Sequence, residues 1–243
     1  FGVAGVCYVN TVRLIGGLGA WVCCGWVGAV RSRIGGMVVG GGADIGLVSV
    51  VDYARLSDCD GGGLVMIPAG MIGCDGATLT VRLFSSVPIE EITAVHADTD
   101  SHTSVVLCAL VLRARGVSAQ VVDFDVRERV ASGGDSGSVL NPTAEGWPEA
   151  GLTIGGMVVA GSPAAVRYPY QVELGEAWFG MTGLPFVYAV WMCRADRVDD
   201  VAVRSGAMVL ERTMLRNRLR MDWMVMTHAK RLGWPTDLAQ RYI

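Results

Sequence analysis

The chain has 243 residues, a formal net charge of −3 and a hydrophobic content of 51%, with a mean hydropathy of +0.42. This length can bury a sizeable core in one large domain or in two smaller ones. Because the net charge is slightly negative and neither half carries a long basic run, we expect no nucleic-acid partner and no membrane partner. No pattern indicates an oligomeric state.

Membrane insertion, secretion and metal binding are also disfavoured. The longest uncharged apolar run, residues 15–30, has 16 residues, whereas a spanning helix needs about 20. The chain opens with an apolar, strand-like segment and not with the charged region of a signal peptide. Seven cysteines show no CxxC and no paired spacing, so we expect reduced, buried thiols in a cytoplasmic protein, without zinc or a disulfide framework.

The first third of the chain alternates between strands and helices. Apolar runs predict strands over residues 1–8, 43–50 and 64–68, and shorter periodic segments predict helices over 30–39 and 52–56. Asn10 and Thr11 follow the first strand. In open α/β sheets, ligands bind at this end of a strand, so Asn10 is a candidate site residue.

The stretch from 71 to 104 carries the next candidates. Thr78, Thr80 and Arg82 alternate with apolar residues, which predicts a strand over 77–86. Ser101, Thr103 and Ser104 precede an apolar run from 105 to 112, which predicts the start of a buried helix. A hydroxyl-rich helix N-terminus suits a carboxylate or a phosphate. A simple N-cap is the alternative interpretation.

The rest of the chain continues the pattern, with a loop or a lost helix over 131–151 and a mainly helical segment from about 198 to the end, including a helix start at 235–238. We expect strands over 117–124, 152–160 and 185–192, and a helix over 174–178. Short strands that alternate with helices imply a parallel sheet with both faces covered.

Two long strands, 77–86 and 185–193, bracket the middle third of the chain. This wiring predicts a two-lobed α/β protein with a hinge. The first lobe would comprise residues 1–88 plus 186–243, and the second lobe residues 89–185. The cleft between the lobes would collect Asn10, Thr80 and residues 101–104.

A second pattern resembles a serine protease. Residues 134–138 read Gly-Asp-Ser-Gly-Ser, and 93–96 end in His96. A Ser–His–Asp set needs residues that converge in space, and the α/β flanks do not match the barrels of that family. The Gly-Asp-Ser-Gly run is more simply a turn. No phosphate-binding or dinucleotide motif occurs, and His102 and His228 stand alone, so we expect no cofactor and no metal.

Six segments together resemble the chorismate dehydratase family of menaquinone biosynthesis. The most specific is Thr-Gly-Leu-Pro-Phe-Val-Tyr-Ala-Val-Trp at 182–191, and the others are 8–11, 43–48, 53–55, 73–76 and 101–105. The resemblance implies a two-lobed type II periplasmic-binding-protein-like fold without a secretion signal. It also implies a hydro-lyase that converts chorismate to 3-[(1-carboxyvinyl)oxy]benzoate in the futalosine pathway.

The resemblance also implies site residues, position by position. Asn10 and Thr80 match the family's positions that orient the substrate for catalysis. Substrate-binding positions fall on Ser101, His102, Thr103, Ser104, Gly161 and Ser162. His102 stands where the family has Arg, Ser162 where it has Asp, and Arg13 where it has Pro.

The chemistry of the candidate residues fits a dianionic substrate. Hydroxyls, amides and helix N-termini can hold carboxylates. Because few ionisable groups stand at these positions, the substrate's own enolpyruvyl carboxylate is the expected base. Two alternatives share the fold: a carboxylate-binding module without chemistry, and the enzyme of the dihydroxynaphthoate-forming step.

Overall fold

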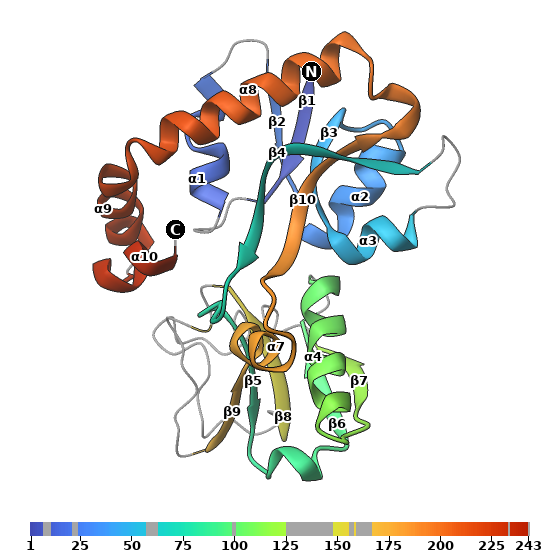
Figure 1. The fold of residues 1–243 in the computed structure, drawn as a ribbon, viewed down its shortest axis with the longest axis vertical. Coiled ribbons are helices and arrows are strands. Elements are labelled where there is room, and N and C mark those ends of the chain that lie inside the picture. Colours follow the sequence, from blue (N-terminus) through green and yellow to red (C-terminus); the bar gives the residue numbers. More distant parts are fainter. Residues whose placement is uncertain are drawn as a thin grey trace, which may run out of the picture. The chain divides into compact units, whose positions relative to one another are not determined.

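The computed structural model describes residues 1–6, 11–20, 24–56, 63–98, 101–124, 148–155, 158, 167–232 and 234–242. Its chain forms two compact units, which Figure 1 traces in the colours of the sequence. Unit 1 consists of Phe1–Gly73 and Val187–Ile243, and unit 2 of Cys74–Phe186. Each unit has its own five-stranded sheet with helices packed on it.

Unit 1 is built on a mixed sheet. The strand order is β2 (Gly25–Gly28), β1 (Gly2–Gly5), β3 (Ile45–Ser49), β10 (Phe186–Arg194) and β4 (Leu64–Cys74). Strand β1 runs parallel to β2 and β3, whereas β10 runs antiparallel to β3. Every residue of β3 is buried, so this strand needs cover on both faces of the sheet.

The helices of unit 1 supply that cover. They are α1 (Val12–Ile15), α2 (Arg31–Val39), α3 (Val50–Arg55), α8 (Val201–Arg218), α9 (Met221–Leu232) and α10 (Thr236–Tyr242). Ile34 and Val38 of α2 pack with Val48 in one core cluster. Leu47 packs with Leu210 of α8 in a second cluster. Since Leu47 and Val48 are neighbours in a strand, the two clusters lie on opposite faces of the sheet.

Unit 2 has a second mixed sheet. Its strand order is β7 (Gln120–Asp123), β6 (Ala94–Ala97), β8 (Ala150–Ile154), β5 (Val81–Ser85) and β9 (Tyr170–Glu173). Strand β6 is parallel to β7 and β8, whereas β5 is antiparallel to β8 and β9. Helix α4 (His102–Ala114) runs along this sheet, and α7 (Leu174–Thr182) follows β9 directly (Figure 1).

The prediction of a purely parallel sheet is wrong for both units. Strand β10 opposes β3, and β5 opposes both of its neighbours. The pattern of short strands and helices reports which segments are buried, but it does not report strand direction. The partners of β5 lie about 65 to 90 residues further along the chain, beyond the range of any local pattern.

Most predicted elements occur with shifted ends. The predicted helix at 30–39 is α2, the helix start at 101–104 is the start of α4, and the strand at 185–192 is β10. Strand β4 continues to Cys74, well beyond the predicted end. Three strands, β2, β6 and β9, were not predicted. Each has four residues, too few to establish a period-two pattern.

The boundaries of the two units differ from those of the expected lobes, by 15 residues at the first boundary and by one residue at the second. The expected first lobe was 1–88 plus 186–243, with 89–185 as the second. In the structure, unit 2 already begins at Cys74. Strand β5 belongs to unit 2 because it pairs with β8 and β9 there. Most of the loop predicted at 131–151, with the Gly-Asp-Ser-Gly run, lies outside the described residues.

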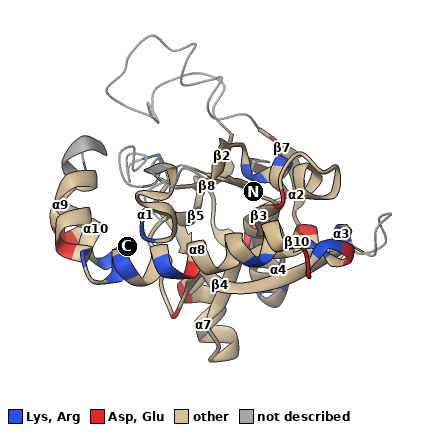
Figure 2. Cartoon of the chain, turned by 90° about the horizontal axis from the view of Figure 1, so that it is seen from above, with Lys and Arg blue, Asp and Glu red and all other residues tan. Residues whose placement is uncertain are grey.

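Charges are sparse on the described elements. In the view of Figure 2, blue and red segments are interspersed, and most of the ribbon carries neither sign. None of the helices in the described part of the chain is both long enough and apolar enough to cross a membrane. The expectation that nucleic acid is not a partner stays a prediction.

Candidate active site

One edge of the unit 2 sheet lies beside Thr80 and the start of α4, which carry five of the predicted site residues. Ala97 at the end of β6 lies opposite Leu152 of β8, and both strands run in the same direction. Val81 at the start of the antiparallel β5 lies opposite Ile154 at the end of β8. The register therefore brings the carboxyl ends of β6 and β8 to the same edge as the amino end of β5. Carboxyl ends of strands are where open α/β sheets bind ligands.

Thr80 lies at this edge, directly before β5. Its side chain is almost fully buried, with 2% exposure, and its carbonyl accepts a 2.8 Å hydrogen bond from the N–H of Gly155. The residue before it, Leu79, has a φ of 70°. This left-handed conformation is unfavourable for a leucine and has to be held by the surrounding structure.

The side chain of Glu173, the last residue of β9, supplies that support. Its Oε1 accepts hydrogen bonds of 3.0 Å from the backbone N–H groups of both Thr78 and Leu79. Its Oε2 accepts a 2.7 Å bond from the N–H of Glu176 and so caps helix α7. Burial raises the pKa of the Glu173 carboxyl above its ordinary value, while these N–H donors and the charge of Arg82 act in the opposite direction.

Helix α4, whose start was predicted at 101–104, follows β6 and begins at the same edge (Figure 1). Ser101 is its N-cap residue, but the Ser101 side chain makes no capping hydrogen bond. Instead, the Ser101 and Ser104 hydroxyls lie 2.8 Å apart and share a hydrogen bond. Ser101, Thr103 and Ser104 are all buried, and the first turn contains no acidic residue. The positive end of the helix dipole is therefore not neutralised by a carboxylate of that turn.

The structure describes only five of the eight predicted site residues. Thr80, Ser101, His102, Thr103 and Ser104 all belong to unit 2, and the sheet register places Thr80 and the start of α4 at one edge. The other three candidates, Asn10, Gly161 and Ser162, lie outside the described residues. The assignment of these eight residues to one substrate site stays a prediction, as does the cleft between lobes.

Two residues at this edge were not among the predicted site residues. Asp98 follows β6 directly and is buried. The sequence could have indicated Asp98 only through the strand that precedes it, and β6 has only four residues, which the apolar pattern did not mark. Glu173 touches the segment before Thr80 from 95 and 94 residues away, and no local pattern could have indicated that contact.

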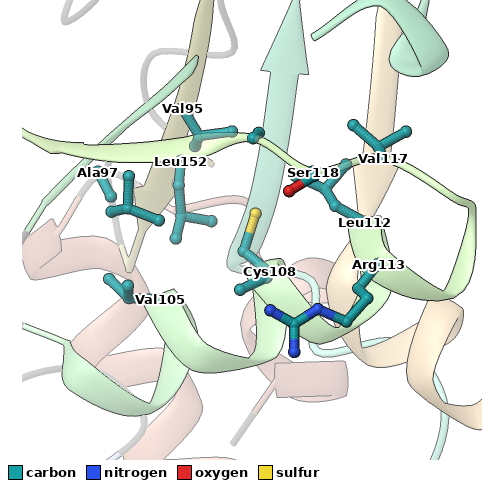
Figure 3. Close-up of a pocket in the computed structure, with 12 residues that line it drawn as sticks. Val95, Ala97, Val105, Cys108, Leu112, Arg113, Val117, Ser118 and Leu152 are labelled. Atoms are coloured by element: carbon teal, nitrogen blue, oxygen red, sulfur yellow. The ribbon is translucent and has the colours of Figure 1, made fainter. Parts of the chain in front are cut away.

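A separate pocket lies between α4 and the sheet (Figure 3). Its lining is mainly apolar and includes Val95, Leu152 and Cys108. Arg113 of α4 also lines the pocket. It leaves about 40 Å³ for the centres of water molecules, which is room for roughly three waters. Burial raises the pKa of the Cys108 thiol to about 12, so this thiol is neutral at ordinary pH. The pocket suits neither a dianion nor nucleophilic chemistry.

Within the described ranges, no group of three or more His, Cys, Asp or Glu side chains could hold a metal ion. His96, the histidine of the protease-like pattern, lies in β6 with its ring centre 5.8 Å from that of Phe124, in an edge-to-face arrangement. The expectation that no cofactor is needed stays a prediction.

Solved structures of other proteins define the class of fold. A structural-genomics protein from Archaeoglobus fulgidus superposes with a TM-score of 0.71 at 14% identity, covering 99% of this chain and 85% of the other. The periplasmic aliphatic sulphonate-binding protein of Escherichia coli gives 0.63 at 13% identity, with 100% and 77% coverage. A Candida albicans protein described as having the generic periplasmic binding protein fold gives 0.59 at 8% identity, with 99% and 79% coverage. The chain therefore has a periplasmic-binding-protein-like α/β fold, as predicted.

The sequence match is more specific than the fold. The model of the menaquinone biosynthesis family matches residues 3–242, so the chain belongs to this family. A chorismate dehydratase from Thermus thermophilus is 26% identical over 215 residues, which cover 88% of this chain and 77% of that protein. Both findings confirm the resemblance inferred from the sequence.

Proposed function

We propose that the protein is a chorismate dehydratase, a hydro-lyase of menaquinone biosynthesis by the futalosine pathway. The match to the menaquinone biosynthesis family along nearly the whole chain, with a chorismate dehydratase among its relatives, carries this proposal. The product would be 3-[(1-carboxyvinyl)oxy]benzoate. A cytoplasmic location and a reaction without cofactor belong to the same proposal and rest on the family resemblance.

The reaction has modest chemical demands. A ring C–H bond breaks, its electron pair forms a new ring double bond, and the hydroxyl on the adjacent carbon leaves with a proton as water. Because the product ring is aromatic, the reaction is downhill and needs a base at the C–H and help for the leaving hydroxyl. The enolpyruvyl carboxylate of the substrate serves as the base.

The protein then has to bind two carboxylates and orient the ring. The N-terminus of α4, with the hydroxyls of Ser101, Thr103 and Ser104 and no acidic residue in its first turn, offers a site for one carboxylate. Thr80 and Asn10 orient the substrate and its leaving hydroxyl. His102, Gly161 and Ser162 complete the substrate-binding set. Holding the reactive groups in place can supply a large part of the rate acceleration.

The decisive experiment is incubation of the purified full chain with chorismate, followed by mass spectrometry of the products. We expect loss of one water from chorismate, unchanged by EDTA, and no conversion with heat-denatured protein. Activity that EDTA abolishes and a divalent ion restores would contradict the cofactor-free reaction. Chorismate that binds without conversion would favour the non-catalytic binding module. Conversion only of the substrate of the dihydroxynaphthoate-forming step would favour that enzyme.

A further inference from the structure

The carboxylate of Glu173 connects two segments of unit 2 that are far apart in the sequence. One oxygen holds the first turn of α7 through the N–H of Glu176, at 2.7 Å. The other oxygen holds the segment before Thr80 through the N–H groups of Thr78 and Leu79, each at 3.0 Å. A helix cap requires only the first of these bonds. The other two are directed at the residues that lead into Thr80.

The segment that Glu173 holds is strained and closely packed. Leu79 has its φ at 70°, a conformation that persists only where surrounding contacts impose it. Gly175 in the first turn of α7 lies so close to this segment that a Cβ atom on it would be 2.6 Å from the carbonyl oxygen of Gly76 and 2.8 Å from the nitrogen of Thr78. The Thr78 hydroxyl also lies 3.1 Å from the Cys74 thiol.

We propose that Glu173 is a positioning residue for Thr80: its carboxylate fixes the backbone of residues 78–79 and thereby sets the place of the Thr80 side chain at the sheet edge. This inference rests on the proposed function, in which Thr80 orients the substrate. Thr80 is held on its other side by the bond from Gly155 to its carbonyl, so the two contacts together define its backbone. A shift of about 1 Å at a positioning group can cost on the order of 100-fold in rate.

Shortening the Glu173 side chain distinguishes a role in capping α7 from a role in positioning Thr80. Asp is a strong N-cap residue, so Glu173→Asp keeps a cap on α7. The side chain is one methylene shorter, and one carboxylate can then no longer reach both α7 and residues 78–79. We expect Glu173→Asp to remain folded by circular dichroism and to lose on the order of 100-fold in kcat with chorismate. Glu176→Gln is the matched control, because it removes a carboxylate from the same turn and keeps every backbone N–H. We expect its kcat to stay within about twofold of the wild type.

Amide hydrogen exchange supplies a readout that does not depend on activity. In the wild type the N–H groups of Thr78 and Leu79 should be protected, and in Glu173→Asp and Glu173→Ala this protection should fall at least tenfold. Wild-type kcat in Glu173→Asp, or unchanged protection in Glu173→Ala, would overturn the proposal. A wild-type protein that does not convert chorismate would refute the proposed function and the catalytic part of this inference, whereas lost protection in the variants would still support the contact itself.

Discussion

Gly175→Ala tests the close contact between α7 and the segment before Thr80. The added Cβ would lie 2.6 Å from the Gly76 carbonyl oxygen and 2.8 Å from the Thr78 nitrogen, where ordinary contacts begin at 3.4 Å. These backbone atoms would therefore have to move by about 0.6 to 0.8 Å, while the hydrogen bond to Glu173 holds the Thr78 nitrogen in place. Overpacking of this kind costs about 1–3 kcal/mol. The higher helix propensity of alanine returns up to about 1 kcal/mol.

Gly180→Ala is the matched control in the same helix, because nothing lies within 4 Å of a Cβ atom at that position. We expect this change to stabilise the protein by about 0.5–1 kcal/mol. Because the helix-propensity gain is common to both changes, urea unfolding followed by circular dichroism should separate the two variants by roughly the overpacking cost, 1–3 kcal/mol in unfolding free energy. Equal stabilities, or a Gly175→Ala variant more stable than the wild type, would refute the packing argument.

Three further predictions concern the helix N-terminus, the buried thiol and the first strand. Ser104→Asp should leave the helix folded, since an acidic residue in the first turn is favourable. It should weaken chorismate binding at least tenfold in calorimetry, because the new carboxylate repels those of the substrate. Ser104→Asn, whose side chain has the shape of Asp without its charge, should bind chorismate more tightly than Ser104→Asp, and equal affinities would contradict the carboxylate site. The Cys108 thiol has a pKa of about 12 in the folded protein against an ordinary 9.0, so its contribution to stability is complete below pH 9.0 and is lost as the pH rises towards about 12. Between about pH 8 and about pH 10.5, the unfolding free energy of the wild type should therefore fall by about 2 kcal/mol more than that of Cys108→Ala. If the unfolding free energies of the two proteins change with pH in the same way, the thiol is not buried. Asn10→Ala should reduce turnover on the order of 100-fold with little change in melting temperature, and Asn10→Asp should be slower still because it adds a negative charge beside a dianion; near-wild-type turnover in both would remove Asn10 from the site.

Local patterns in the sequence predicted the elements that have a clear apolar period or run. Helix α4, which follows the N-cap residue Ser101, the buried strand β3 and the long strand β10 all follow from such patterns. The family resemblance, carried mainly by residues 182–191, predicted the two-lobed fold class and the activity. Local patterns did not predict the short strands β2, β6 and β9, because four residues do not establish a period.

The sequence by itself determined the fold class, the family and the hydroxyl-rich start of α4. Only the tertiary structure decided that both sheets are mixed, that Thr80 and the start of α4 lie at the same edge of the unit 2 sheet, and that Glu173 holds the backbone before Thr80. The physical reason is the range of each signal. Periodicity and capping depend on residues within one or two turns of each other, whereas strand direction and register depend on pairings between segments up to about 145 residues apart. The contacts that shape the candidate site belong to the second kind.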